Sequence, residues 1–548
     1  MKYLDASTFE PVHLSESIKQ DQMTPFRSPN LEMAYDAEEI KTLDGAKMIT
    51  SAYSWSFVSN LLIFLRQHMM TLSILLILLR FFYRRYLHPL SSYPGPFLAS
   101  ITRLWKVWSV YSGHTERDYI AVHKKYGKVV RVGPNELSFA APAAAYDIFT
   151  PGNGFTKTDF YAVFPLRDIF GEVREWKHAH MKRMAVVPYS LASVQKMGPY
   201  IEDVQKELIR KVGEYAKAAK PCDLGELLHY FAFDVLGEFA FSQRYGFLAQ
   251  EKDVGGTIKF IDDSQRYNGL VGQMPEMRHL LRENPVLQLL MQLLRPRKVA
   301  QMALKEIERR KESSGGFYVS SSKKDLLGQL LEASAKYPGK LSDWDVFSVA
   351  QGAIGAGADS TASTMQSFVY YILSSPDVYT KLTKEIRSAG LSEYVSWAEA
   401  QELLYFQACL SETMRLRPAV GLSIPRYVPR GGARIDDKYY PGGTIASVNG
   451  WVVHRDPTVY GDHPDEFRPE RWLTGNVKEM KRHMYQFGGG GHLCIGRNLA
   501  LFEMNKILPQ LLANFDLELV YPGKPLQSHS YFFVVQSGLE VMVKRSET

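Results

Sequence analysis

The chain has 548 residues, a formal net charge of +7 and 45% hydrophobic residues. This composition excludes a disordered chain and allows one large core with an additional N-terminal region. The basic residues are dispersed instead of gathered in one stripe with aromatic residues between them, so no nucleic acid is expected as a partner. A mildly basic protein fits anionic lipid or an acidic protein partner better.

The three cysteines, Cys222, Cys409 and Cys494, lie far apart in the chain. An odd number of distant cysteines argues against a disulfide framework and against a four-ligand zinc site. We therefore expect the domain that carries them to face a reducing compartment.

Residues 1–53 are predicted to form a polar, weakly structured tail, because they lack a long apolar run. Residues 54–85 are predicted to form a membrane anchor. Its apolar part, Phe57–Leu79, is about long enough for a single helix to cross a bilayer. Polar residues at 66–68 interrupt this run, which leaves a buried or interfacial helix as the alternative.

The orientation of the anchor follows from its flanks. The segment starts too far from the N-terminus for a secretory signal and has no small-residue cleavage site. Arg80, Arg84 and Arg85 follow the apolar run closely, and positive charge favours the cytosolic side of a membrane. The sequence therefore predicts a single-pass anchor, with the rest of the chain in the cytosol.

Residues 86–548 are predicted to form one catalytic domain, which begins near the turn Tyr93-Pro-Gly-Pro96. Short β-rich pieces, Val129–Val132 and Glu136–Phe139, precede long stretches with helical spacing of apolar residues. The expected fold class is mainly α with small β-sheets. A segment rich in serine and glycine at 311–324 is predicted to be a mobile loop between helices.

The most informative segment is Phe487-Gly-Gly-Gly-Gly-His-Leu-Cys-Ile-Gly496, which a helical pattern follows. Glycines permit positive φ angles and let the main chain approach a flat ligand. A cysteine at a helix start lies near unpaired N–H groups and partial positive charge, which favour the thiolate, a good iron ligand. Taken separately, the two halves would be an ordinary loop and a small buried side chain.

This segment resembles the heme-binding loop of the cytochrome P-450 superfamily, whose pattern is Phe-Gly-x-Gly-x-Arg/His-x-Cys-x-Gly. The pattern is met here at Phe487, Gly488, Gly490, His492, Cys494 and Gly496. The resemblance implies the cytochrome P-450 fold and a bound heme b whose iron has Cys494 as its axial ligand. It also implies that Phe487 belongs to the cofactor site and that His492 hydrogen-bonds a heme propionate.

The segment Glu412-Thr-Met-Arg415 puts a carboxylate and a guanidinium on one helix face, as any surface helix can. In the family's fold, an arginine of a later motif closes this pair, and Arg471 stands at its position in Phe467-Arg-Pro-Glu-Arg-Trp472. Buried ion pairs seldom add much stability but are costly to break. The resemblance therefore implies a structural triad that fixes the geometry behind the heme.

The segment Ala356-Gly-Ala-Asp-Ser-Thr361 lies in a helical run expected from about Asp343 to Leu373. It resembles the family's Ala-Gly-x-Asp/Glu-Thr-Thr stretch, in which the acid and the following hydroxyl deliver protons to dioxygen. Asp359 is then the proton source and the Ser360 hydroxyl is the expected donor, although the family commonly has threonine there. Thr361 is the rival donor, and a plain packing contact is the alternative to any role.

Two further segments offer heme contacts. Trp176-Lys-His-Ala-His-Met-Lys-Arg183 resembles the family's heme-contacting helix, which implies contacts from His178 and Lys182, with a solvated basic face as the alternative. Arg426 occupies the place of another propionate-binding arginine of the family, and a guanidinium suits a carboxylate geometrically.

The resemblance covers residues from about Tyr86 to Arg545, and its details look most like fungal microsomal members of the pisatin-demethylase type. It implies a monooxygenase of secondary metabolism in the endoplasmic reticulum membrane. One oxygen atom of O2 would enter an apolar small molecule by hydroxylation, epoxidation or oxidative demethylation. Electrons would come from NADPH-cytochrome P-450 reductase, because this sequence has no flavin domain and no dinucleotide-binding glycine motif.

Two other functions remain open. A heme-thiolate isomerase or dehydratase would need no reductase, and Asp359 with Ser360 argues against it. A heme-binding or membrane scaffold protein with a silent site is the other. The substrate is not identified by the segments expected to line its pocket, Phe155–Phe170, Ala419–Ile424 and Tyr531–Gln536.

Overall fold

The computed structural model of the chain describes residues 37–164, 167–287, 289, 298–312, 324–337 and 339–546. Most of the tail predicted at 1–53 and most of the loop predicted at 311–324 lie outside the described residues. The chain divides into two compact units, Met1–Leu79 and Arg80–Thr548, each of which is described by itself.

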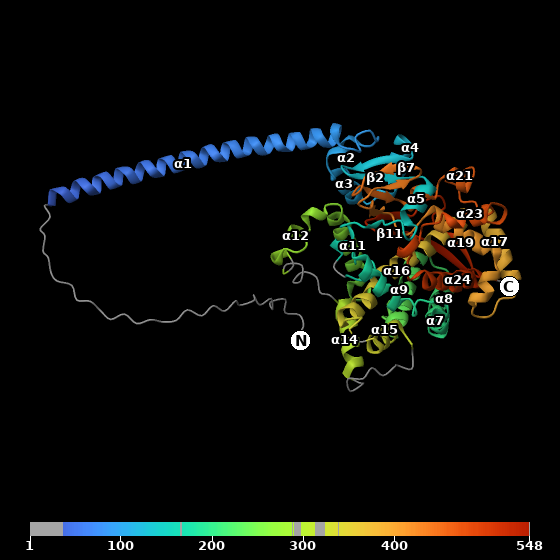
Figure 1. The fold of residues 1–548 in the computed structure, drawn as a ribbon. Helices are drawn as coiled ribbons and strands as arrows, with labels where there is room; N and C mark the ends of the chain where they lie inside the picture. The colour runs from blue at the N-terminus through green and yellow to red at the C-terminus, as the bar shows by residue number, and fades with distance from the viewer. Residues whose placement is uncertain are drawn as a thin grey trace. The chain divides into compact units, whose positions relative to one another are not determined.

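The first unit holds most of one long helix, α1 (Ala37–Phe82), which Figure 1 draws as a continuous ribbon. The weak structure predicted for residues 37–53 is therefore wrong. These residues are polar but include several alanines, glutamates and lysines, which favour a helix. A polar composition predicts exposure to solvent and does not exclude a helix.

The apolar part of this helix is uncovered. The segment Phe57–Leu87 has a mean hydropathy of 1.9 and is long and apolar enough to cross a membrane, and none of it is buried. Among the described residues, no protein surface covers Phe57–Leu79, which disfavours the alternative of a buried core helix. A π-helical turn, η1 (Tyr83–Leu87), continues the chain into the second unit.

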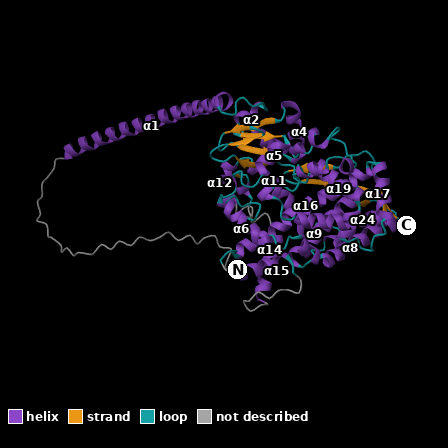
Figure 2. Cartoon of the chain, turned by 45° about the vertical axis from the view of Figure 1, so that its right-hand side comes forward, coloured by secondary structure: helices purple, strands orange, loops and turns teal. Residues whose placement is uncertain are grey.

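The second unit is mainly helical, and Figure 2 shows the strands as small groups among many helices. Its helices are α2 (Phe97–Ile101), α3 (Leu104–Ser112), α4 (Thr115–Tyr126), α5 (Pro142–Phe149), α6 (Glu175–Ala185), α7 (Leu191–Lys196), α8 (Gly198–Ala218), α9 (Leu224–Phe241), α10 (Phe247–Gln250), α11 (Thr257–Gly272), α12 (Arg278–Leu281), α14 (Lys298–Glu312), α15 (Leu326–Lys336), α16 (Asp343–Leu373), α17 (Pro376–Ser388), α18 (Trp397–Glu402), α19 (Leu404–Leu416), α20 (Gly450–Val453), α21 (Pro457–Tyr460), α22 (Arg471–Thr474), α23 (Val477–Arg482) and α24 (Arg497–Asn514).

The strands form four small sheets, which confirms the predicted fold class. The largest sheet has the order β1-β2-β8-β5-β3, and the others are β4-β12-β9, β10-β11 and β6-β7. The strands are β1 (Val129–Gly133), β2 (Glu136–Phe139), β3 (Thr156–Lys157), β4 (Cys222–Asp223), β5 (Ile424–Tyr427), β6 (Ala433–Ile435), β7 (Lys438–Tyr440), β8 (Ile445–Val448), β9 (Phe515–Leu519), β10 (Gln527–Ser530), β11 (Val534–Ser537) and β12 (Glu540–Arg545).

Helix α16 runs through the core with the bounds predicted from the sequence. Ser342 caps its first turn: the hydroxyl accepts the N–H of Asp345, and the Asp345 carboxylate accepts the N–H of Ser342. Helices α9 and α24 pack against it, as Figure 1 also shows. At Gly357 a Cβ would lie 2.9 Å from Leu236 of α9, so the glycine allows these two helices to come close.

Candidate functional site

The loop before Cys494 is closed on itself. The Cys494 backbone N–H donates to the Phe487 carbonyl at 2.8 Å, and Gly488 and Gly490 have φ angles of 72° and 58°. A Cβ on Gly490 would lie 1.7 Å from the carbonyl oxygen of Phe149 at the end of α5. The glycines thus allow a tight turn and a close approach to α5, in addition to the approach to a flat ligand expected from the sequence.

The Cys494 thiol is exposed, whereas Cys222 and Cys409 are buried. Protein atoms nevertheless surround Cys494, and the resulting desolvation raises the pKa of its thiol above the usual value, although hydrogen bonds from the Gly496 and Arg497 N–H groups lower it. The helix start does stabilise the sulfur as predicted, but this effect does not outweigh burial. A metal ion is the partner that would convert such a thiol to the thiolate.

The middle of α16 has one open face. Ala356 is exposed and Ser360 is half-buried, whereas Ala358, Asp359 and Thr361 are buried on the other sides of the helix. Nothing lies within 4 Å of a Cβ built on Gly355. A core helix with an uncovered turn is suited to line a space for a ligand.

The acid of this motif does not point along the open face. Asp359 Oδ1 accepts a hydrogen bond from His229 Nε2 of α9 at 2.8 Å, and its Oδ2 accepts one from Gln265 Nε2 of α11. Gln265 in turn accepts the backbone N–H of Phe533 at 3.0 Å. Both carboxylate oxygens of Asp359 therefore have partners on neighbouring elements.

The Ser360 hydroxyl donates to the Ala356 carbonyl of its own helix at 2.8 Å. No hydrogen bond joins Asp359 to Ser360 among the described residues, so the structure does not bring together the acid and hydroxyl predicted to act as a pair. Adjacent residues of a helix point about 100° apart, which explains the separation. Thr361 is 3% exposed and lies away from the open face.

Glu412, Arg415 and Arg471 come together as the sequence resemblance implied. Arg415 donates to both oxygens of Glu412 at 2.8 Å, and Arg471 Nε donates to Glu412 Oε1 at 2.9 Å. The carboxylate also accepts the Trp472 indole N–H at 2.8 Å. Glu412 and Arg415 are fully buried, and the network ties α19 to α22.

Two buried basic side chains lie opposite each other in the largest sheet. Lys157 of β3 pairs with Arg426 of β5, and no sequence pattern had indicated Lys157. Burial and the charge of Arg426 lower the pKa of Lys157 to about 7. Lys157 donates to the carbonyls of Ile169 and Phe170 at 2.8 Å. Like charges directly opposite are unfavourable, so an anion at this place would be stabilising.

Arg426 has free donors. Its Nη1 donates to the Tyr161 hydroxyl and to the Pro425 carbonyl, whereas Nε and Nη2 have no hydrogen-bond partner among the described residues. The guanidinium is 3% exposed and lies 5.1 Å from the centre of the Tyr161 ring. A fork of two free N–H groups matches a carboxylate.

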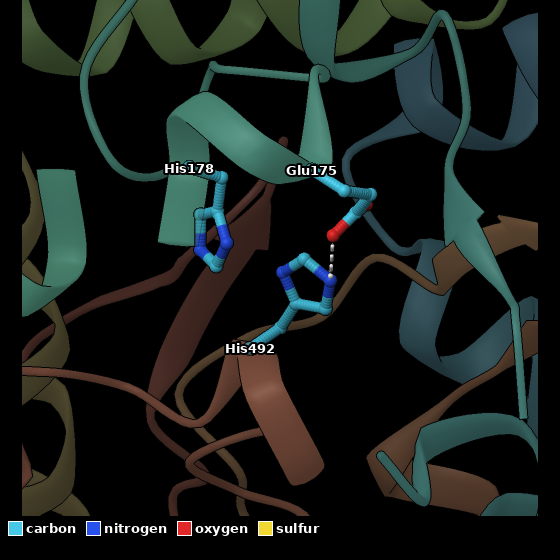
Figure 3. A group of neighbouring side chains, drawn as sticks. All are labelled: Glu175, His178 and His492. Carbon is cyan, nitrogen blue, oxygen red and sulfur yellow. Dashed lines mark ion pairs between the residues drawn. The ribbon is translucent and has the colours of Figure 1, made fainter. Parts of the chain in front are cut away.

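Glu175, His178 and His492 point toward one another, as Figure 3 shows. His492 Nε2 lies 3.1 Å from Glu175 Oε2, and the rings of His178 and His492 are 4.4 Å apart. Interaction with His492 helps to lower the pKa of Glu175 to about 2 despite burial, and burial with the charge of Lys157 lowers that of His178 to about 3. At neutral pH the group is one carboxylate with two neutral imidazoles.

These three side chains offer ligand atoms within 4.8 Å of one another, which is close enough to hold a metal ion. However, burial and the positive charges of Arg426 and Lys157 lower the pKa of His492. The same charges disfavour a metal cation at this group. His492 Nδ1 is buried without a partner among the described residues. A ligand carboxylate placed beside Nδ1, in addition to Glu175 at Nε2, would favour the doubly protonated, positively charged form of the ring.

Lys182 lies against the loop that carries Cys494. Its ammonium donates to the carbonyls of Gly491 and Leu493 at 2.9 and 2.6 Å, so it holds the Cys494 loop to α6. Its charge also lowers the pKa of the Cys494 thiol. The side chain supports the loop directly, and the contact with the cofactor that the resemblance implied stays a prediction.

The residues present fit a heme. An exposed thiol with two backbone N–H groups on its sulfur suits an axial ligand, and the open turn of α16 suits a flat macrocycle. Arg426 with its two free donors, beside Lys157, suits the two carboxylates of heme b. Phe487 anchors the loop through its carbonyl and packs against the main core.

The chain is similar to known proteins over most of its length. The family model described as Cytochrome P450 matches residues 94–542. The cytochrome P450 monooxygenase gsfF of Penicillium aethiopicum is 33% identical over 487 residues, which are 84% of this chain and 95% of the relative. The cytochrome P450 monooxygenase cicH of Emericella nidulans is 32% identical over 477 residues, 83% of this chain and 94% of the relative. The cytochrome P450 monooxygenase mfmA of Annulohypoxylon moriforme is 33% identical over 475 residues, 82% and 92% respectively.

Proposed function

Because the chain belongs to the cytochrome P450 family and is an oxidoreductase of its monooxygenase type, we propose that Cys494 holds the iron of heme b and that the enzyme inserts one oxygen atom of O2 into an apolar small molecule. Bound heme supplies the activation of O2, and the protein supplies binding, orientation and protons. The relatives are fungal monooxygenases, which supports a role in secondary metabolism.

The observation that carries this proposal is the setting of Cys494. Among the three cysteines it alone is exposed, its sulfur receives the N–H groups of Gly496 and Arg497, and its loop is closed by a hydrogen bond to Phe487. Such an arrangement holds a sulfur in one place and stabilises negative charge on it.

Ser360 is the residue that we propose to hand a proton to the reacting oxygen. It stands on the open face of α16, and its hydroxyl can turn from the Ala356 carbonyl toward the site. Asp359 supplies protons only after its bond to His229 or Gln265 opens. The chain therefore has both the acid and the hydroxyl of the family's proton-delivery motif. Their presence favours a monooxygenase over an isomerase or dehydratase.

The substrate pocket is proposed to be aromatic. All three segments expected to line it contribute to one cluster, in which Phe164 and Phe170 lie 5.0 Å apart and each contacts Phe532 edge-on. Leu422 belongs to the same cluster. Ring edges and faces of this kind favour flat apolar or aromatic molecules.

Electrons are proposed to come from NADPH-cytochrome P-450 reductase. A groove of about 560 Å³ borders the Cys494 loop and is lined by Gly488–Gly490 together with Lys481, Arg482 and Arg497. Basic side chains around a groove beside the iron ligand would steer an acidic protein surface to it.

The location proposed is the endoplasmic reticulum membrane, with the catalytic domain in the cytosol. The segment Phe57–Leu87 would span the membrane. Phe97, Trp108 and Leu280 are more than half exposed, and an ion pair of 3.1 Å between Arg103 and Glu276 holds their elements near each other. This apolar patch would rest on the membrane surface.

Labelled oxygen tests the function. The full chain in microsomes is first titrated optically with a panel of terpenoids, polyketides and alkaloids, and a ligand that shifts the heme spectrum is then incubated with reductase, NADPH and ¹⁸O2. We expect one ¹⁸O atom in the product and no product without reductase. An unlabelled product that forms without reductase would indicate an isomerase or dehydratase instead.

Protease protection tests the location. In intact microsomes, protease should remove the catalytic domain without detergent, and alkaline carbonate should leave the anchor in the membrane. A domain that is protected until detergent is added would reverse the orientation, and extraction by carbonate would exclude a spanning helix.

A further inference from the structure

We propose that Arg84, Arg85 and Arg131 form a binding site for the phosphate group of a phospholipid. Arg84 and Arg85 belong to η1, and Arg131 belongs to β1. Helix α2 packs against both elements. The site is separate from the heme site, and the choice of a lipid as its ligand rests on the membrane anchor of the proposed function.

Arg131 is a buried cation with unused donors. Its side chain is 1% exposed, and its Nη2 donates to the carbonyls of Arg84 and Pro134 at 2.8 and 2.6 Å. Its Nε and Nη1 are buried without a hydrogen-bond partner among the described residues, and so is Arg85 Nε. Burial and the charges of Arg85 and Arg84 lower the pKa of Arg131 to about 10, which leaves it charged at neutral pH.

This cluster has no paired carboxylate in the part of the chain that the structure describes. Among the described residues, none forms an ion pair with Arg84, Arg85 or Arg131, and the nearby Glu276 is paired with Arg103 at 3.1 Å. A buried charge without a counterion is unfavourable, because it has lost the hydration that no partner replaces. An anion bound at these arginines would therefore stabilise the folded protein.

The surroundings favour a lipid as the source of the anion. Arg84 and Arg85 are half-buried, so the cluster reaches the surface in front of Arg131. The Arg85 guanidinium lies over the rings of Tyr86 and Phe97, at 5.3 and 5.8 Å, and these rings are 59% and 66% exposed. A phosphate at the arginines would thus have its acyl chains over exposed aromatic surface.

Position in the chain gives a second argument. Arg84 and Arg85 stand at the end of the apolar segment Phe57–Leu87, the place where a spanning helix reaches the headgroups. Arginine matches phosphate oxygens with two parallel N–H groups, and a net negative headgroup adds attraction. Phosphatidic acid is therefore the probe that should bind best.

Native mass spectrometry of the heme-loaded full chain in a nonionic detergent tests the site. Phosphatidic acid, phosphatidylcholine and inorganic phosphate are titrated separately. We expect one retained phosphatidic acid whose Kd rises roughly tenfold in Arg85→Gln and in Arg131→Gln, the loss of one charge-assisted hydrogen bond. Arg117→Gln is the control, because it removes the same charge from a side chain that is 58% exposed and lies outside the cluster.

The three ligands separate the possible outcomes. If inorganic phosphate binds with the same dependence on Arg85 and Arg131, the site binds free phosphate and the lipid proposal is wrong. If only phosphatidic acid shows this dependence, the site binds a lipid headgroup. Equal Kd values for phosphatidic acid in wild type, Arg85→Gln and Arg117→Gln would overturn the site. Arg85→Gln changes only a half-buried side chain, so the test holds even if Arg131→Gln fails to fold.

Discussion

His229 Nε2 lies 2.8 Å from Asp359 Oδ1, which joins α9 to the acid in the middle of α16. Both side chains are at most 12% exposed. Gln265 donates to the other oxygen of Asp359 and accepts the backbone N–H of Phe533. These two hydrogen bonds connect Asp359 to the aromatic wall of the proposed pocket. A substrate that moves Phe533 would thereby change the bonds that hold Asp359.

The His229–Asp359 bond should be measurable as a coupling energy. We expect His229→Phe to destabilise the protein by about 1–3 kcal/mol, because Asp359 Oδ1 loses its donor in a buried place. The double variant His229→Phe/Asp359→Asn should be more stable than the sum of the single changes predicts. Thermal unfolding of all four proteins checks this, and strictly additive losses would show that the bond contributes nothing.

Ser360, not Thr361, should control coupling of NADPH consumption to product. Ser360→Ala should slow product formation on the order of tenfold or more and release more peroxide, because a positioned proton donor is lost. Ser360→Thr should keep or improve coupling, since the methyl group restricts the hydroxyl. Thr361→Ala is the matched control. If that change alone uncouples the reaction, Thr361 is the proton donor instead of Ser360.

The features that a recognisable sequence motif or periodicity specifies could be predicted. Helix α16 has the predicted bounds, and the triad of Glu412, Arg415 and Arg471 closes as the resemblance implied. His229 and Lys157 could not be predicted, because their partners are more than a hundred residues away and no spacing rule connects them. Their roles depend on which helices and strands become neighbours, and periodicity does not specify that.

Removal of the Glu412 charge should be strongly destabilising. The carboxylate accepts from Arg415, Arg471 and Trp472, so Glu412→Gln leaves two buried guanidinium groups without their counterion. We expect a loss of about 3–5 kcal/mol in denaturant unfolding. Glu207→Gln, in a surface pair with Arg210, should cost about 0–1 kcal/mol. A similar small loss for Glu412→Gln would remove the structural role of the triad.

His454 should make the fold sensitive to mild acid. Its Nδ1 lies 3.2 Å from the Arg415 carbonyl, and its Nε2 accepts the Tyr485 N–H at 2.8 Å, so the buried ring is neutral. Burial and the charge of Arg415 lower its pKa to about 3. The unfolded chain, with an ordinary pKa near 6.5, therefore binds a proton that the folded chain refuses, and stability falls as pH drops from about 6.5 toward 3.

The size of this effect can be measured. At pH 5 the His454 contribution to the loss should be about 2 kcal/mol relative to neutral pH. Thermal unfolding between pH 7 and 5 should show a smaller slope for His454→Asn than for wild type. His463→Asn, at a side chain that is 64% exposed, should keep the wild-type slope. Equal slopes in all three proteins would contradict the assignment.

The iron ligand is the central claim, and the carbon monoxide spectrum of the reduced protein tests it most directly. Wild type should show the strongly red-shifted band of a thiolate-bound heme. Cys494→Ser should bind heme without that band, whereas Cys409→Ser, at a buried cysteine of α19, should keep it. A thiolate band in Cys494→Ser, or its absence from heme-loaded wild type, would contradict the assignment of Cys494.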